Sequence, residues 1–132
     1  MKYLLDTHII LWTLIGSNKL PSEIKDIILN TNNQIYYSTV SAWEVEIKHQ
    51  KVGSFKLSGN DFCLLCDQNN VFNIPITNKH ICELDKLNKH KNIQHNDPFD
   101  KMLLCQAKAE NMIFITHDKK FNTYKEENIM LV

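Results

Sequence analysis

Two aspartates stand three positions apart in the segment HNDPFDK (residues 95–101), just ahead of a stretch with helical spacing. Asp97 is a residue type that caps helix N-termini, and Pro98 suits the first helical position because its missing N–H would have no partner there. Capping also accounts for an acid at Asp100, near the positive end of the helix dipole. Asp100, however, lies at helical spacing from Leu103 and shares the apolar stripe that we expect to face the core. A carboxylate on that face is a candidate for chemistry.

Three more acids lie where an expected strand gives way to a helix. Asp6 ends the strand-like KYLLD, and Asp118 follows the strand-like MIFITH. Glu44 falls in the expected first turn of the helix that follows the second strand, QIYYSTV. Capping explains each acid singly, since Ser41 and Glu44 match a capping box. Ligands of open parallel α/β sheets bind beyond the carboxyl ends of the strands. We therefore expect these three acids and Asp100 to converge at one edge of a sheet.

Four carboxylates at one edge repel one another unless a positive charge lies between them. Oxygen ligands alone favour Mg²⁺ or Mn²⁺, and such an ion activates water and stabilises charge on a phosphodiester. Zinc would require His or Cys ligands. His8 and His117 adjoin Asp6 and Asp118 in the sequence, but neighbours in a strand project to opposite faces, so we do not expect them to be ligands. The chemistry that this pattern favours is phosphodiester hydrolysis.

Polar neighbours of the acids are candidates for supporting roles. Thr7 and Thr116 are placed to hydrogen-bond a ligand carboxylate or a metal-bound water, although threonine at a strand end is also an ordinary β-former. Lysines near the same edge are candidates for substrate contact, although helical lysines are usually solvated surface residues. These lysines are Lys48, Lys51, Lys101, Lys119 and Lys120.

The elements that must position these residues alternate along the chain. Short apolar runs predict strands near 2–6, 34–40, 71–76, 112–117 and 129–132. Helical patterns fall near 8–16, 22–30, 41–52, 60–69, 78–88, 98–110 and 119–124. This alternation predicts an α/β fold with a mainly parallel central sheet.

Composition limits the alternatives. A chain of 132 residues, 43% of them apolar, is expected to form one domain over residues 1–132. Its 15 acidic and 15 basic residues balance, so net charge neither favours nor excludes nucleic acid. All the basic residues are lysine, so any phosphate contact must come from ammonium groups rather than from the paired donors of arginine.

The cysteines and the N-terminus bear on location. Cys63 and Cys66 form a C-x-x-C without a second paired motif, and Cys82 and Cys105 stand apart, so we interpret all four as thiols of a reducing cytoplasm. The apolar N-terminal stretch is interrupted by Asp6 and lacks a clean cleavage site, unlike a signal peptide. No apolar run is long enough to span a bilayer, so we expect no membrane partner.

Four blocks, in this order along the chain, resemble the PIN-domain family and more closely its VapC-type toxin branch. The blocks are LLDTHIILW with Asp6, SAWEVEIK with Glu44, DPFDKMLLCQA with Asp100 and ITHD with Asp118. The resemblance implies a three-layer α/β/α sandwich and an endoribonuclease dependent on Mg²⁺ or Mn²⁺, with these four acids as catalytic and metal-binding residues. It also implies an RNA substrate, an antitoxin partner that occupies the active site, and frequent homodimers.

Two positions depart from that branch. Lys101 follows the third acid where arginine is common, which keeps the charge but loses the paired donors. His117 stands where a small residue is more usual, which bears on metal geometry and pH response. Asp97 lies outside the four matched acids and retains the capping interpretation.

Three other functions were weighed against this one. A haloacid dehalogenase-like phosphohydrolase requires D-x-D, whereas the first strand is followed by Asp6, Thr7 and His8. A receiver-like signalling module requires an aspartate after a middle strand, and NIPITNKH has none. A non-catalytic PIN-like module that binds protein or RNA is the main alternative, and the presence of all four acids argues against it.

Overall fold

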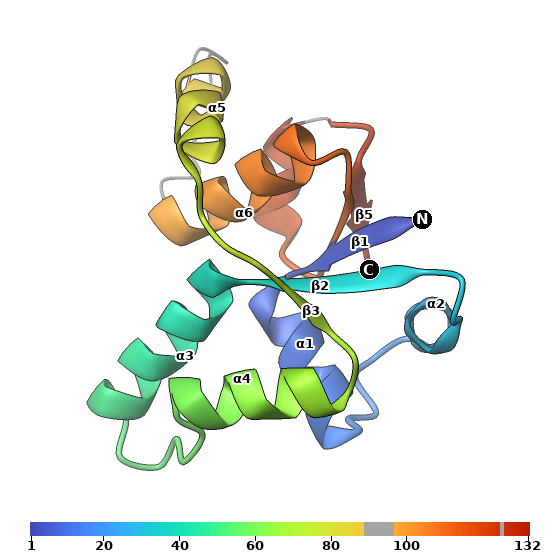
Figure 1. Ribbon diagram of the computed structural model, residues 1–132, viewed down its shortest axis with the longest axis vertical. Helices are drawn as coiled ribbons and strands as arrows, with labels where there is room; N and C mark the ends of the chain where they lie inside the picture. The colour runs from blue at the N-terminus through green and yellow to red at the C-terminus, as the bar shows by residue number, and fades with distance from the viewer. Residues whose placement is uncertain (89–96, 125) are drawn as a thin grey trace.

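The structure is a computed structural model that describes residues 1–88, 97–124 and 126–132. A five-stranded sheet runs through its centre in the order β3-β2-β1-β4-β5, and every neighbouring pair of strands is parallel (Figure 1). The strands are β1 (Lys2–Leu5), β2 (Gln34–Ser38), β3 (Phe72–Ile74), β4 (Ile113–Thr116) and β5 (Ile129–Leu131). Each lies within a predicted strand, and the predicted α/β class with a mainly parallel sheet is confirmed.

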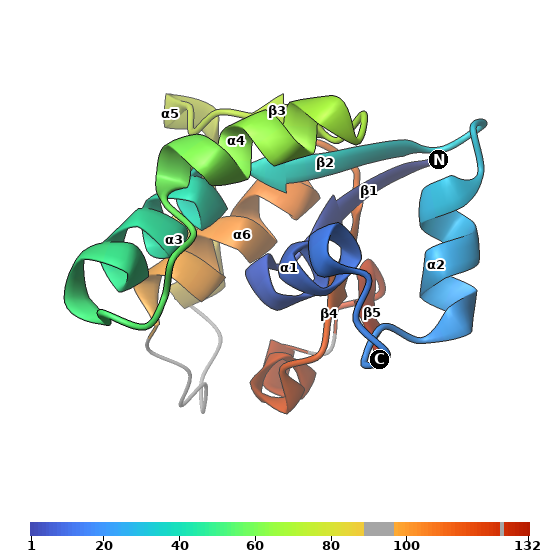
Figure 2. The ribbon, with the colours of Figure 1, turned by 90° about the horizontal axis from the view of Figure 1, so that it is seen from below.

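Helical segments connect the strands (Figures 1 and 2). They are α1 (Thr7–Ile15), α2 (Ser22–Leu29), α3 (Thr39–Lys51), α4 (Gly59–Gln68), α5 (Asn78–Asn88), α6 (Pro98–Ala109) and the 3₁₀ helix η1 (Lys119–Tyr124). No helix among the described residues is long and apolar enough to cross a membrane. The first two residues of HNDPFDK, 95 and 96, lie outside the described residues.

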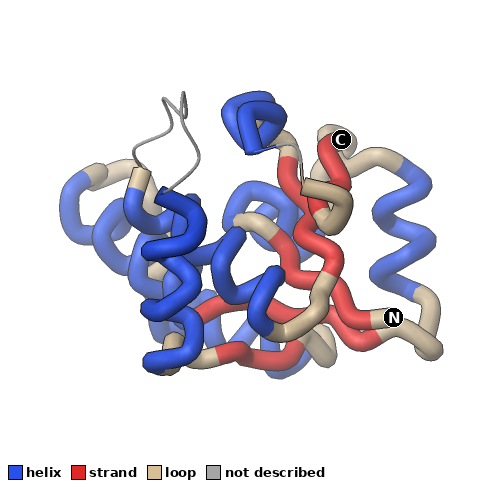
Figure 3. The backbone as a smooth tube through the Cα atoms, turned by 90° about the horizontal axis from the view of Figure 1, so that it is seen from above, coloured by secondary structure: helices blue, strands red, loops and turns tan. Residues whose placement is uncertain are grey.

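Two cores lie on the two faces of the sheet, because successive side chains of a strand point to opposite sides. In β1, Leu4 packs into one core with residues of α5, α6 and η1. Its neighbours Tyr3 and Leu5 pack into the other core, with residues of α1, α2, α3 and α4. Figure 3 shows the strands enclosed by these helices. The result is a three-layer α/β/α sandwich, as predicted.

The strand order reverses at β1, which fixes where a ligand would bind. From β1 the chain moves outward through β2 and β3 on one side, and it returns to place β4 and β5 on the other. The carboxyl ends of β1 and β4 therefore adjoin, with Leu5 in register with Ile115. The backbone N–H of Asp6 continues this pairing by donating to the Ile115 carbonyl at 2.9 Å. A crevice at such a reversal is the usual ligand site of an open α/β sheet.

Helix α3 corrects two expectations. It begins at Thr39 rather than near residue 41, with Ser38 as the N-cap whose side chain accepts from Val40 N–H. Glu44 therefore lies in the second turn, and the capping-box interpretation of Ser41 with Glu44 is wrong. Trp43 stands at helical spacing from Val40 and Ile47, an apolar stripe that favours a core position. The structure shows that this interpretation is wrong, because 56% of Trp43 is exposed and its ring meets Phe99 of α6 edge-on at 4.9 Å between centroids.

Candidate active site

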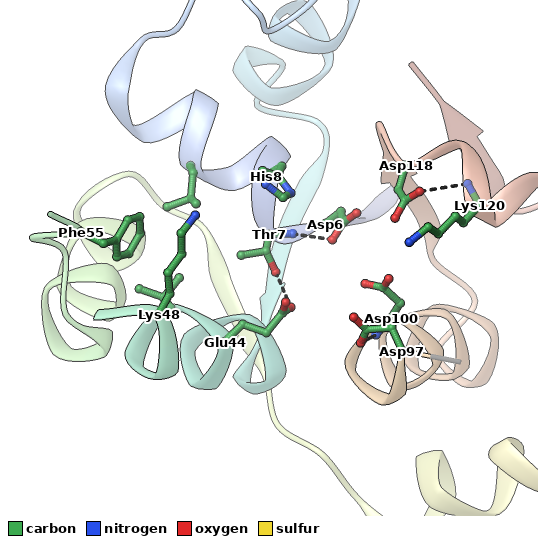
Figure 4. A pocket seen from close by; sticks show the side chains of 12 residues that line it. Asp6, Thr7, His8, Glu44, Lys48, Phe55, Asp97, Asp100, Asp118 and Lys120 are labelled. Atoms are coloured by element: carbon green, nitrogen blue, oxygen red, sulfur yellow. Dashed lines mark hydrogen bonds between the residues drawn. The ribbon is translucent and has the colours of Figure 1, made fainter. Parts of the chain in front are cut away.

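A pocket of about 210 Å³ opens at the crevice between the carboxyl ends of β1 and β4 (Figure 4). It holds the four acids that the sequence predicted to converge and one more. Figure 4 shows Asp6 and Asp118 on one side of the opening, Asp97 and Asp100 opposite them, and Glu44 on the side toward α3. The carboxylates that line it are Asp6, Glu44, Asp97, Asp100 and Asp118.

Asp6 is the most enclosed of these acids, with 5% of the residue exposed. Its two oxygens have different partners: Oδ1 accepts the N–H of Thr7 at 2.7 Å, and Oδ2 accepts the hydroxyl of Thr116 at 2.6 Å. The first bond makes Asp6 the N-cap of α1. Burial raises the pKa of Asp6, and the nearby Asp118 charge adds to the rise, against the lowering effect of the hydrogen bonds. Asp6 is thus both a cap and a desolvated carboxylate aimed at the pocket.

Thr116 links the first and last acids. The residue is fully buried at the end of β4, and while its hydroxyl donates to Asp6 its oxygen accepts the N–H of Asp118 at 3.1 Å. Asp118 in turn accepts the N–H of Lys120 at 2.9 Å through Oδ1, which caps η1. One side chain therefore fixes the carboxylates that follow two neighbouring strands.

Glu44 reaches the pocket from α3 and is held by Thr7. The Thr7 hydroxyl donates to Glu44 Oε1 at 2.8 Å, and the oxygen of that Thr7 hydroxyl lies 2.8 Å from Oγ of buried Ser41. Desolvation raises the pKa of Glu44 to about 7, with smaller contributions from the neighbouring charges of Asp6 and Asp100. Without a positive partner this carboxylate is therefore harder to ionise than that of an ordinary glutamate.

The two aspartates at the start of α6 differ in their contacts, and Asp97 caps the helix as the sequence suggested. Asp97 is the N-cap, and its Oδ1 accepts the N–H groups of Phe99 at 2.9 Å and Asp100 at 3.2 Å. Asp100 lies in the first turn and is half-buried at the pocket wall. The structure nevertheless adds Asp97 to the lining of the pocket, which the capping interpretation did not anticipate.

Positive groups in the pocket are fewer than the acids. Lys48 and Lys120 line it, whereas Lys51, Lys101 and Lys119 are outside the lining that the described residues form. His8 also lines the pocket from the first turn of α1. His117 does not, because its Nδ1 lies 2.7 Å from the carbonyl oxygen of Val132 and its ring packs against Trp12.

An apolar end of the pocket escaped the sequence analysis. We use this name for Leu11, Val45 and Phe55, which line the pocket and belong to one apolar cluster. Figure 4 shows Phe55 on the side away from Asp97 and Asp100. Phe55 belongs to the connection between α3 and α4, which has no hydrophobic period to reveal its orientation. Ser41 was also missed as a partner of Thr7, because a serine in a capping position carries no sign of a second role.

The donor set fits a hydrated divalent cation. Among the described residues, no three His, Cys, Asp or Glu side chains are arranged so that they could hold a metal ion between them. Mg²⁺ does not need such a cage, because it keeps several waters and binds proteins through one or two carboxylates. Buried carboxylates with raised pKa values, facing a pocket wide enough for several waters, provide that kind of site.

Solved structures of similar fold come from bacterial complexes. VapBC-1 from nontypeable Haemophilus influenzae matches with a TM-score of 0.75 and 20% identity over 99% of this chain and 98% of that one. VapBC2 from Rickettsia felis, bound to a DNA fragment from their promoter, matches with a TM-score of 0.74 and 18% identity over 100% and 98% of the two chains. DNA-bound VapBC from Salmonella typhimurium matches with a TM-score of 0.72 and 17% identity over 98% of this chain and 97% of that one. At these identities the likeness shows the fold.

Among curated proteins, no sequence matches the chain. The family model of the PIN domain matches residues 3–127, a span that contains all five acids of the pocket. The chain belongs to the PIN domain family.

Proposed function

We propose that the protein is a metal-dependent endoribonuclease that hydrolyses RNA phosphodiesters. The observation that carries the proposal is the convergence of carboxylates from separate segments on one pocket at the strand-order reversal. Carboxylates gathered in one pocket repel one another and so destabilise a fold, and a pocket that holds five of them needs a function that uses them. Binding a divalent cation that in turn binds a phosphodiester is such a function.

In this proposal the metal ligands are drawn from Asp6, Glu44, Asp100 and Asp118. Bound Mg²⁺ or Mn²⁺ supplies an activated water and stabilises the charge that develops on the phosphodiester. Thr116 and Thr7 keep the carboxylates of Asp6 and Glu44 oriented through their hydroxyls. Asp97 holds the start of α6, and with it the position of Asp100.

Lysines supply the contacts to the RNA backbone. Lys48 lines the pocket and is the first candidate, while Lys101 and Lys119 follow Asp100 and Asp118 directly in the chain and are candidates at its rim. Lacking arginine, the protein makes these contacts through single ammonium groups, so its affinity for RNA depends strongly on salt.

The likeness to VapBC complexes supports a role in a toxin-antitoxin pair. We propose that this chain is the toxin, that a cognate antitoxin protein binds over the pocket, and that the toxin forms a homodimer. An RNA substrate and unpaired thiols in the folded chain agree with action in the cytoplasm.

Cleavage of a pool of structured RNAs by the purified protein tests the enzymatic proposal. The reactions contain Mg²⁺, Mn²⁺ or excess chelator, and Asp100→Asn is assayed beside the wild type. We expect cleavage with either metal, none with chelator, and a loss of at least about a hundredfold in the variant, as for removal of a charge-stabilising group. If well-folded wild-type protein without a bound inhibitor cuts no RNA with either metal, the nuclease proposal is wrong and the non-catalytic binding module takes its place.

A further inference from the structure

The pocket has two chemically different ends. The five carboxylates lie toward one end, and Leu11, Val45 and Phe55, which belong to one apolar cluster, form the apolar end. Figure 4 shows Lys48 beside Phe55. A metal-bound phosphodiester uses the acidic end alone. The apolar end is therefore surface that the proposed hydrolysis leaves unexplained.

The backbone holds Phe55 in place. Its N–H donates to the Val52 carbonyl at 2.9 Å, and its own carbonyl accepts from His49 Nδ1 at 2.9 Å. Farther along the same connection, Glu46 accepts the N–H of Gly59 at 3.0 Å, which ties the start of α4 to α3. A side chain added at Gly59 would meet Glu46 Cβ at 3.0 Å, so the two helices pack closely there. Phe55 is thus presented by a braced segment.

Lys48 adds a positive charge to this end. Its ammonium lies 4.7 Å from the centroid of the Phe55 ring, and within the described part of the chain it forms no ion pair. Glu44 and Lys48 stand one turn apart on α3, about 6 Å along the helix axis. A ligand that spans both ends of the pocket therefore meets carboxylates, then a cation beside an aromatic ring, within about one helical turn.

We propose that the apolar end of the pocket is a nucleobase subsite, in which an unpaired base beside the scissile phosphodiester lies against Phe55 while Lys48 contacts the adjacent backbone phosphate. The inference rests on the proposed function and deepens it by naming the residues that would hold a base beside the cleaved bond. A chain that carries flat apolar groups and a negative charge on each backbone unit matches an aromatic wall flanked by a cation. A base within a duplex is stacked on both faces, so only an unpaired base fits.

The test measures binding of short single-stranded RNA to protein that carries Asp100→Asn, in Mg²⁺, by fluorescence anisotropy. In that background we compare Phe55→Ala, Phe55→Tyr and two matched controls. Leu57→Ala removes a half-buried side chain from the same connection, and Phe72→Ala removes an exposed aromatic at the far edge of the sheet. Stacking on an aromatic side chain is worth about 1–3 kcal/mol per base, so Phe55→Ala should weaken binding about tenfold. Phe55→Tyr and both controls should stay within about twofold of the parent.

Two further readouts separate base recognition from a loss of fold. In the first, one abasic nucleotide is moved along the RNA. With parent protein, affinity should fall by the same factor as for Phe55→Ala when the abasic nucleotide is at one particular position. With Phe55→Ala, an abasic nucleotide at that position should cause no further loss of affinity, because the two changes remove the same contact. Lys48→Met should reduce the slope of log affinity against log salt by about 0.7, the value for one phosphate contact on a single strand. A merely structural Phe55 or Lys48 would give neither result.

Failure of the inference is distinguishable from failure of the nuclease proposal. If RNA is cut by the wild type but Phe55→Ala binds it no more weakly than Leu57→Ala, the base subsite is wrong and the nuclease stands. If RNA binds with the expected dependence on Phe55 but is cleaved with neither Mg²⁺ nor Mn²⁺, the subsite proposal holds and the nuclease proposal is wrong. If parent protein binds no single-stranded RNA, the subsite is wrong, and a protein segment becomes the occupant to test.

Discussion

The hydroxyl of Thr116 donates a 2.6 Å hydrogen bond to Asp6, a residue 110 positions earlier in the chain. The bond crosses from β4 to β1 at the point where the strand order reverses, and it lies inside the pocket wall. Because the same hydroxyl oxygen accepts from Asp118 N–H, this one threonine couples the first and last acids of the proposed metal site.

Thr116→Val tests that coupling. The substitution leaves an oxygen of Asp6 and the N–H of Asp118 without their shared partner in a buried place, which should lower the free energy of unfolding by about 1–3 kcal/mol. It also removes a contact that lowers the pKa of Asp6, so the pH at which activity reaches half its maximum should move upward. Urea denaturation and a pH-rate profile measure the two effects. Thr123→Val, whose hydroxyl bonds the Lys120 carbonyl in an exposed turn, is the control and should change neither.

Asp6→Asn should abolish cleavage and leave the fold intact. The amide keeps an acceptor for the N–H of Thr7, and removing a desolvated charge from among neighbouring carboxylates does not destabilise metal-free protein. We expect a melting temperature in chelator at or above that of the wild type. A variant that melts much earlier yet keeps its specific activity would show that Asp6 is a structural cap.

The stability of metal-free protein should depend on pH through Glu44. Its folded-state pKa of about 7 exceeds the ordinary glutamate value of 4.5, so between these values the folded state holds a proton that the unfolded state releases. The free energy of unfolding therefore falls as pH rises through this window. Glu44→Gln cannot ionise, so in chelator it should melt a few degrees above the wild type at pH 8 and close to it at pH 4. The side chain is partly exposed, which limits the size of the shift.

Glu46→Gln, on the same helix, should show the opposite dependence of stability on pH. The N–H of Gly59 and the side chain of Gln50 lower the pKa of Glu46, so its stabilising effect is present at neutral pH and is lost as pH falls. This variant should melt below the wild type at pH 8, and the difference should narrow in acid. If both variants change stability equally at every pH, the raised pKa of Glu44 is not the cause.

Substitutions at Asp97 and at Asp100 should have different effects on cleavage. Asp97→Asn keeps a capping side chain for α6, so cleavage and stability should stay near the wild type, while Asp97→Ala should lower the free energy of unfolding by about 1 kcal/mol. Asp100→Asn should remove cleavage with little loss of stability. Because Asp97 also lines the pocket, a loss of activity in Asp97→Asn equal to that in Asp100→Asn would move it from the cap into the catalytic set.

The cysteines should differ in reactivity. Burial raises the pKa of Cys66 to about 12 and that of Cys105 to about 11, whereas Cys82 is exposed on α5. The thiolate is the reactive form, so a maleimide at pH 7 should modify Cys82 in the folded protein and reach Cys66 and Cys105 only after unfolding. Mass spectrometry of labelled peptides gives the order of modification. Early labelling of Cys105 would mean that the packing of α6 opens readily.

The sequence predicted the elements well because their patterns are local. All the strands and helices of the described residues fall close to the predicted ranges, and the acids at strand ends followed from the alternation of strands and helices. The start of α3 was misplaced because Ser38 and Ser41 are both good caps, and the β-branched pair between them favours a strand.

The features that the sequence did not predict are the orientations of side chains, which depend on which side of a helix packs against neighbouring elements. Trp43 shares an apolar stripe in the sequence, yet α3 buries the side that carries Val40, Ser41 and Val45, so the tryptophan faces outward. Because the polar residue Ser41 lies on the buried side of α3, the spacing of apolar residues alone does not reveal which side of the helix is buried. Phe55 was invisible for a different reason, because a connection between helices has no period from which orientation can be inferred.

The bond between Thr116 and Asp6 can form only late in the synthesis of the chain. The partner strand β4 is made more than a hundred residues after Asp6 itself. A nascent chain that stops before β4 has neither the hydroxyl that orients Asp6 nor the aspartate that follows that strand. An incomplete copy therefore lacks the assembled pocket.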